Sequence, residues 1–150
     1  MKTIEKDITV NVPVRQAYDQ WTQFEEFPQF MEGVEEVRQL DDKHLHWKAK
    51  IAGKVEEWDA EIFEQTPDQH IAWRSTDGAK NAGRVSFQPS APSQTNVHLE
   101  IDYEPEGVIE TIGDAIGAVD ARVTGDLERF KESVESRGSA TGKWRGEIHG

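Results

Sequence analysis

Apolar and polar residues alternate with a period of two over most of this chain, which is the pattern of half-buried β-strands. The first such segment, residues 4–12, places Ile4, Ile8 and Val10 on one face, and Pro13 ends it. Six further segments follow the same rule after residue 33. They are residues 34–40, 44–52, 54–64, 70–75, 81–88 and 95–103, with residues 89–93 expected as a loop before the last strand.

Two short stretches between the first and second strands have helical spacing instead. Val14, Tyr18 and Trp21 recur at intervals of three or four residues and predict a helix directly after Pro13. A second helical turn is expected over residues 25–31, where Phe24, Phe27, Phe30 and Met31 cluster around Pro28. Proline inside that stretch predicts a bend or a restart.

The longest helix is predicted over residues 108–136. Its apolar residues are spaced three or four apart throughout and form one stripe: Ile109, Ile112, Ile116, Val119, Val123, Leu127, Phe130 and Val134. Gly138 is a suitable stop. The polar, glycine-rich residues that follow are expected to be mobile or pinned only by Trp144. We therefore predict one domain over residues 1–137 and a tail over residues 138–150.

This order of elements predicts an α+β fold. Strands joined by short turns form antiparallel meanders, and a seven-stranded sheet with one apolar face must cover that face. Only the long helix is large enough to do so. We expect a helix-grip fold, in which a curved seven-stranded antiparallel sheet wraps around a long C-terminal helix, with two short helices after the first strand.

Composition narrows the function classes. The net charge of −12, from 29 acidic and 17 basic residues, repels phosphate backbones and anionic lipid surfaces. We therefore expect no nucleic-acid partner and no stable membrane insertion, and no apolar run approaches the roughly 20 residues of a membrane span. The chain has no cysteine, which excludes disulfides and thiolate chemistry. A cytoplasmic location is the default expectation, and nothing in the sequence sets the oligomeric state.

Particular residues give these elements a family resemblance. The segments that carry it are Val12–Val14 with Ala17, Tyr18 and Trp21; Phe24 to Met31; Trp58 to Ile62; Ile71 to Ser75 with Gly83; and Leu127 to Lys131. Over nearly the whole chain they resemble the SRPBCC superfamily, which includes START lipid-transfer domains and polyketide cyclases. Within it, the chain looks most like bacterial cyclase/dehydrase proteins of the coenzyme-Q-binding-like branch.

The resemblance implies an elongated cavity between the sheet and the long helix, holding a small apolar molecule. Aromatic residues on the inward strand faces are the candidate walls, because aromatic surfaces with a few polar groups suit small-molecule pockets. The candidate ligand-binding residues are Trp47, Trp58, Trp73, Phe87, Tyr103, Phe27, Phe30, Gly113, Ile116 and Gly117. Core packing is the competing interpretation of the aromatic residues, and close helix packing is that of the two glycines.

Candidate chemistry beyond this cavity is sparse. Glu56 shares the register of the inward Trp58, so it is a candidate base if buried. His44 and His46 share an outward face but lack an evident third ligand, and we expect neither a metal nor a cofactor. No nucleophile elbow, phosphate loop or zinc helix is present.

Three functions remain open from the sequence. The leading hypothesis is binding or carrying a lipid, an isoprenoid or quinone, or an aromatic polyketide, without catalysis. A cyclase or dehydratase, with an ionisable group such as Glu56 or Tyr103 in the cavity, is the second. A protein-interaction module of the ribosome-associated or co-chaperone kind, docking through Trp144 and Ile148, is the third.

Overall fold

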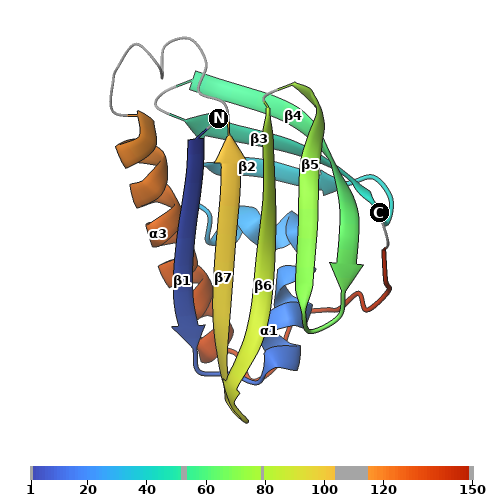
Figure 1. The fold of residues 1–150 in the computed structure, drawn as a ribbon, viewed down its shortest axis with the longest axis vertical. Coiled ribbons are helices and arrows are strands. Elements are labelled where there is room, and N and C mark those ends of the chain that lie inside the picture. The colour runs from blue at the N-terminus through green and yellow to red at the C-terminus, as the bar shows by residue number, and fades with distance from the viewer. Residues whose placement is uncertain (1, 52–53, 79, 104–114, 149–150) are drawn as a thin grey trace.

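The protein folds around one antiparallel sheet. The computed structural model describes residues 2–51, 54–78, 80–103 and 115–148. Seven strands are arranged in the order β1-β7-β6-β5-β4-β3-β2, and every neighbouring pair is antiparallel. They are β1 (Lys2–Val10), β2 (Val34–Gln39), β3 (His44–Ile51), β4 (Lys54–Thr66), β5 (His70–Gly78), β6 (Asn81–Ala91) and β7 (Gln94–Tyr103). The predicted seven-stranded antiparallel sheet is confirmed (Figure 1).

The helices lie on one side of this sheet (Figure 1). Helix α1 (Val14–Trp21) starts directly after Pro13, which suits the extended residue before a helix. The next segment is a 3₁₀ helix, η1 (Phe24–Gln29), which contains Pro28. The long C-terminal helix α3 is described over Ala115–Ser136. Its expected start at residue 108 lies outside the described residues.

The C-terminal half of the predicted stripe on α3 is confirmed as core. Val123, Leu127, Phe130 and Val134 are all buried against the inner face of the sheet. Positions 109 and 112 of the same stripe lie outside the described residues, as do the side chains at 116 and 119. The helix-grip arrangement therefore rests on spacing that was already visible in the sequence.

Strand β4 is where the sheet bends. Its first part pairs with β3 and its last part with β5, and the pairing with β5 shifts register between Asp59 and Ala60 and again between Ile62 and Glu64. Such irregularities add a residue to one strand and increase its local bend and twist. The bend carries β4 around the end of the sheet and gives the inner face its concave shape (Figure 1).

Two strands, β5 and β6, each continue three residues past their predicted ends. Strand β6 continues through Pro89 to Ala91, so the expected loop shrinks to a short turn, with a register shift between Pro89 and Ala91. Proline is tolerated in a strand at such an irregularity, because no ladder hydrogen bond has to come from it. Strand β5 likewise continues to Gly78, whose φ of 85° needs a residue without a Cβ.

The C-terminal tail packs on the domain instead of being pinned only by Trp144. Ile148 is buried and forms a two-way backbone bridge with Gln65 at the end of β4, with both N–O distances at 2.9 Å. The Trp144 ring is partly buried against the core. Both apolar tail residues are therefore engaged within the chain, which removes them as free docking elements.

None of the described helices is long and apolar enough to cross a membrane.

Candidate functional site

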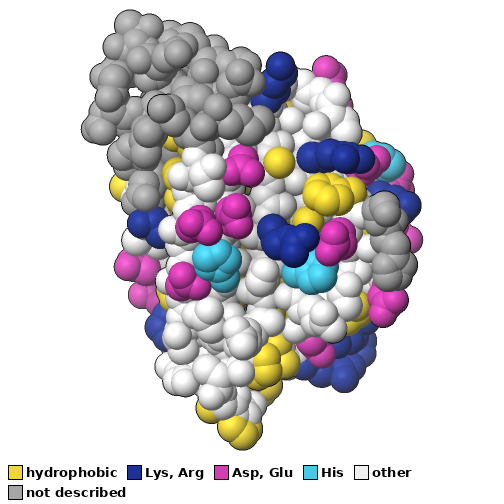
Figure 2. All heavy atoms as spheres, in the orientation of Figure 1, with side chains coloured by type: hydrophobic (Ala, Val, Ile, Leu, Met, Phe, Trp, Pro, Cys, Tyr) yellow, Lys and Arg dark blue, Asp and Glu magenta, His cyan; other side chains and the backbone are white. Residues whose placement is uncertain are grey.

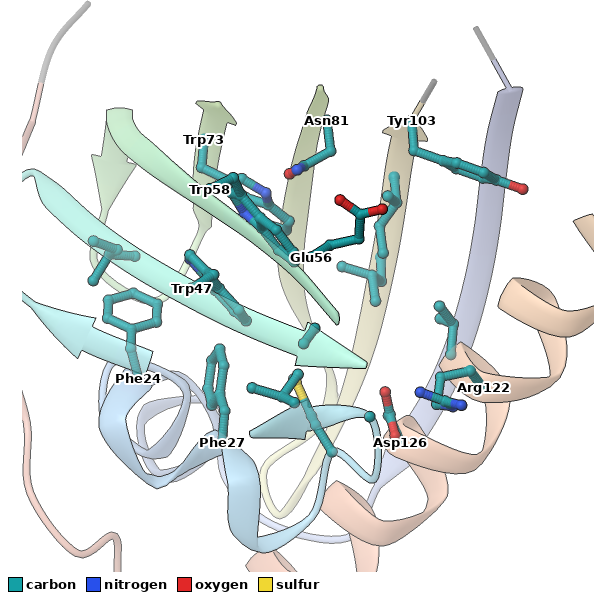
Figure 3. Close-up of a pocket in the computed structure, with 18 of the residues that line it drawn as sticks. Phe24, Phe27, Trp47, Glu56, Trp58, Trp73, Asn81, Tyr103, Arg122 and Asp126 are labelled. Carbon is teal, nitrogen blue, oxygen red and sulfur yellow. The ribbon is translucent and has the colours of Figure 1, made fainter. Parts of the chain in front are cut away.

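A cavity of about 240 Å³ lies between the concave face of the sheet and the helices (Figure 3). Most of its wall is aromatic or aliphatic. The lining residues are Trp21, Phe24, Phe27, Met31, Gly33, Val34, Leu45, Trp47, Ala49, Glu56, Trp58, Ile62, Ile71, Trp73, Lys80, Asn81, Leu99, Ile101, Tyr103, Arg122, Val123 and Asp126. Protein interiors are otherwise close-packed, so an unfilled apolar volume of this size is a feature that needs an explanation.

Two stacked tryptophans form one wall of the cavity. Trp47 on β3 and Trp58 on β4 are directly opposite each other in the strand register, and their rings lie parallel with centroids 5.8 Å apart. Phe27 from η1 continues this surface, with its ring 5.6 Å from that of Trp47. Cross-strand aromatic pairs stabilise a sheet, and this pair also offers a flat apolar surface to the cavity.

A glycine on the neighbouring strand determines where the third tryptophan lies. Trp73 on β5 is paired with Gly83 on β6. A Cβ built on Gly83 would lie 2.4 Å from Cζ2 of Trp73, so the indole covers the space left by the missing side chain. The Trp73 ring therefore lies close over Gly83, where it lines the cavity.

Polar groups gather toward one part of the cavity (Figure 3). Glu56 and Asn81 lie near Trp58 and Trp73 on the sheet, and Arg122 and Asp126 face the cavity from α3. The Asp126 carboxylate accepts hydrogen bonds from the Arg129 guanidinium at 2.6 Å and from the backbone N–H of Glu32 at 3.1 Å. Burial raises the pKa of the Asp126 carboxyl, although the bond from Arg129 opposes that shift.

Arg122 connects α3 to strand β3. Its Nη1 donates to the backbone oxygen of Lys50 at 3.0 Å, at the end of β3. Arg129 donates in the same way to the oxygen of Phe30 at 2.7 Å. The first bond fastens the helix to β3 and the second fastens it to the segment between η1 and β2, so the polar side of the cavity is also where α3 is attached to its neighbours.

Five of the predicted site residues line the cavity: Trp47, Trp58, Trp73, Tyr103 and Phe27. Phe87 and Phe30 are not among the lining residues. Phe87 packs edge-on against Tyr18 and Trp21, because α1 covers that end of β6. Phe30 packs against Phe27 and Phe130 in the core. Gly113 lies outside the described residues, and so do the side-chain positions of Ile116 and Gly117.

Sequence reasoning missed several lining residues, and for one of them a signal existed. Asp126 is three residues after Val123 and four before Phe130, so helical spacing already places it on the inward face of α3. Trp21 and Phe24 were assigned to helices but not to the site. Their contribution depends on how far α1 and η1 reach under the sheet, which local patterns do not encode.

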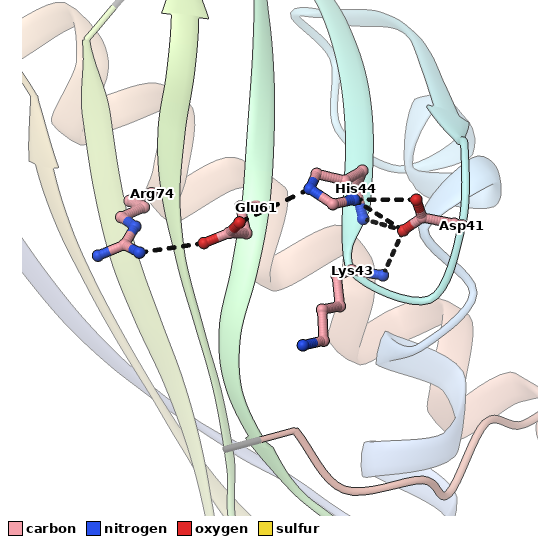
Figure 4. A network of polar contacts seen from close by, with 5 residues as sticks. All are labelled: Asp41, Lys43, His44, Glu61 and Arg74. Carbon is pink, nitrogen blue, oxygen red and sulfur yellow. Dashed lines mark hydrogen bonds and ion pairs between the residues drawn. The ribbon is translucent and has the colours of Figure 1, made fainter. Parts of the chain in front are cut away.

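The outer face of the sheet carries charge networks. Figure 2 shows histidines set among acidic and basic side chains on this face. In Figure 4, Glu61 joins Arg74, at 3.0 Å, to His44, at 3.6 Å, and His44 also contacts Asp41 at 2.9 Å. Backbone N–H groups, led by that of Lys43, lower the pKa of Asp41. Arg74 is therefore part of a surface ion pair.

Two other histidines on this face have carboxylate partners. A hydrogen bond to Asp59, 2.7 Å away, raises the pKa of His46, and one to Asp7, 2.8 Å away, raises the pKa of His98. Ligand atoms of His98 and two glutamates lie within 4.8 Å of one another on this exposed surface. These histidines are engaged as ion-pair partners on the solvent side of the sheet, away from the cavity.

The family model for polyketide cyclase/dehydrase and lipid transport matches residues 10–132. The chain belongs to this family. An uncharacterized 17.2 kDa protein of Streptomyces lincolnensis is 48% identical over 149 residues, which is 99% of each chain. The cavity is therefore that of a member of the polyketide cyclase/dehydrase and lipid transport family.

Solved structures agree with the fold. A protein of Deinococcus radiodurans is 27% identical and superposes with a TM-score of 0.73 over 91% of this chain and 98% of its own. The ZhuI aromatase/cyclase of Streptomyces sp. R1128 is 15% identical, with a TM-score of 0.78 over 95% of this chain and 99% of its own. At that identity, the likeness to ZhuI shows a shared fold alone.

Proposed function

We propose that this protein binds and carries a small, largely apolar molecule in the cavity between its sheet and α3. The observation that carries the proposal is the unfilled volume of about 240 Å³ faced by Trp47, Trp58 and Trp73. Large aromatic side chains that could fill a core are instead held back along the wall, by stacking in one case and by Gly83 in the other. Apolar cavities of this kind accept apolar ligands readily.

The distribution of polar groups suggests how such a ligand lies. An apolar, flat body suits the wall formed by Trp47, Trp58 and Phe27, and a polar end group suits the side near Asn81 and Arg122. Lipids, isoprenoid quinones and aromatic polyketides all combine these two parts. The resemblance to the coenzyme-Q-binding-like branch is the reason to keep quinones in this set.

Native mass spectrometry of freshly purified protein, followed by organic extraction, tests the proposal directly. We expect a defined additional mass that is lost on denaturation. The companion measurement is a titration with the neutral fluorescent probe N-phenyl-1-naphthylamine, which should quench tryptophan fluorescence with saturation. A bare chain that also fails to bind the probe would overturn the carrier function.

A cyclase or dehydratase is the second candidate, and the carboxyl groups of the cavity favour it. Glu56 and Asp126 both line the cavity, and burial raises the pKa of Asp126. Dehydration needs a base to remove a proton from carbon and an acid to protonate the departing hydroxyl, and carboxyl groups can serve in either role. Unchanged turnover of an aromatic polyketone by a Glu56→Gln/Asp126→Asn double variant would exclude these residues from catalysis.

A further inference from the structure

Helix α1 is buried on more sides than its contact with the sheet explains. Five consecutive residues, Ala17 to Trp21, are buried, including Asp19 at 6% exposure and Gln20 at 3%. A short helix lying on a sheet buries one stripe and leaves its polar face to solvent. Here the polar face is covered by residues 139–148, which run back beneath α1 after α3 ends (Figure 1).

The first contacts of this tail are with the polar face of α1. Gln20 and Thr141 form two hydrogen bonds of 3.0 Å. The backbone N–H of Thr141 donates to Oε1 of Gln20, and Nε2 of Gln20 donates to the hydroxyl of Thr141. The backbone N–H of Trp144 donates to the hydroxyl of Thr22 at 3.2 Å. The tail thus supplies hydrogen-bond partners to the polar groups of α1 that it covers.

Arg145 is the central contact. Its guanidinium forms ion pairs with Asp19 on α1 and, at 2.7 Å, with Asp68 in the turn between β4 and β5. It also lies 5.5 Å from the ring centroid of Tyr18. One side chain of the tail therefore joins α1 to the turn at the end of β4, with a planar fork suited to two carboxylates.

The end of the tail is attached to β4 itself. Ile148 pairs with Gln65 through two backbone hydrogen bonds, and the Gln65 side chain donates to the hydroxyl of Tyr18 at 2.9 Å. The pairing of β3 with β4 ends at His44 and Glu61, so the tail occupies the edge of β4 that β3 leaves open. The tail is anchored at both of its ends.

The face of this assembly opposite the tail is part of the cavity. Trp21 on α1 and Phe24 and Phe27 on η1 line it. The tail contacts the same two elements from behind, through Arg145 to Asp19 on α1 and through Thr141 to Glu26 on η1. The match to the family model ends at residue 132, so the tail lies beyond it. We propose that residues 139–148 are a strap, with Arg145 as its positioning residue, that holds the α1–η1 wall and sets how long a ligand is retained.

The role of the strap in ligand retention rests on the proposed ligand binding, whereas its role in holding the α1–η1 wall does not. The experiment measures the two roles separately. Arg145→Gln removes the ion pairs, and Lys131→Gln is the matched control. The Lys131→Gln variant also loses a partly buried cation. That cation bonds to the backbone of Thr9 and to Glu135, and neither residue belongs to the strap. Hydrogen–deuterium exchange of peptides over residues 14–31 and stopped-flow release of N-phenyl-1-naphthylamine are measured on the full-length chain of each variant.

We expect Arg145→Gln to accelerate exchange over α1 and η1 and to speed probe release at least about fivefold, with Lys131→Gln unchanged in both. Arg145→Lys should restore part of each effect, because it keeps the charge but not the fork. Faster exchange confined to residues 139–148 would overturn the strap. Faster exchange over α1 and η1 with unchanged probe release would overturn its role in retention.

Two further results have a defined meaning. If the unaltered protein binds no probe, the carrier function fails, and the exchange comparison still decides whether Arg145 holds the wall. If Arg145→Gln does not fold, Asp68→Asn replaces it, because Asp19 then keeps its cation and asparagine tolerates the positive φ of 63° at that position. A smaller change in the same direction supports the strap, and unchanged exchange and release in Asp68→Asn overturn it.

Discussion

The two faces of the sheet use the same strands for opposite purposes. On β3 and β4, Trp47 and Trp58 face inward to a cavity, while His46 and Asp59, their immediate neighbours, form an ion pair on the solvent side. Apolar burial on the inner face stabilises the fold, and the cavity reduces that stabilisation. Charged side chains on the outer face form ion pairs exposed to water, and each such pair contributes little to the free energy of unfolding. Stability therefore depends mainly on the inner face, and so does the ligand binding that we propose.

The largest expected effect comes from the filled part of the inner face. Phe130→Ala removes a fully buried ring that packs edge-on against Trp21, with centroids 5.0 Å apart. We expect the free energy of unfolding to fall by about 3–5 kcal/mol, because a cavity is added to the lost burial. Urea denaturation measures this. Phe63→Ala, the same change beneath Arg74 on the outer face, should cost far less, and equal losses would contradict the comparison.

Gly83→Ala tests the boundary between the two faces. The added methyl group would lie 2.4 Å from the Trp73 ring and 2.9 Å from the backbone oxygen of Glu100, so the ring has to move into the cavity. We expect a loss of about 1–3 kcal/mol from overpacking, together with weaker probe binding. Gly138→Ala is the matched control, since no atom lies within 4 Å of its new Cβ. A Gly83→Ala protein that matches it in both measurements would refute this view of the wall.

The unfilled part of the inner face should separate stability from binding. Trp58→Leu keeps the wall apolar but removes the stacked partner of Trp47. We expect a stability loss of only about 1 kcal/mol, and probe affinity at least tenfold lower by fluorescence titration. Phe63→Leu on the outer face serves as the control. If both variants bind the probe equally well, the stacked pair is not the binding wall.

The smallest effect is expected on the outer face and depends on pH. The bond to Asp7 raises the pKa of His98 above its ordinary value of 6.5 in the folded state and lowers that of Asp7 below 3.8. The His98 contribution is thus complete below pH 6.5 and is lost as pH rises through its folded pKa. The Asp7 contribution is lost as pH falls through its own lowered value.

The pair should therefore stabilise the fold most between about pH 4 and 6.5, by about 0.2–1 kcal/mol given its exposure. Unfolding free energies of the unaltered protein and His98→Gln, compared at pH 5.5 and 8.5, measure this. The difference between the two proteins should shrink at the higher pH and in high salt. A difference that is constant with pH would mean that packing, and not charge, is the cause.

The inward faces of the strands could be predicted because side-chain direction alternates strictly along a strand. That rule placed Trp47, Trp58 and Trp73 correctly, and helical spacing did the same for the core residues of α3. The rule says which way a side chain points and not what meets it. Phe87 points inward as predicted, yet α1 covers it, and so it is core instead of cavity wall.

By itself, the sequence determined the order of the elements, the antiparallel sheet, the inward aromatic residues and the polar outer face, because each depends on neighbours within a few residues. Only the tertiary structure decided where the sheet bends and which inward aromatic residues face the cavity instead of packing in the core. It also placed Asp126 on the wall of that cavity. It also decided that the tail covers Asp19 and Gln20. The tail contacts join residues more than 100 positions apart, and no local period records the geometry of any of these features.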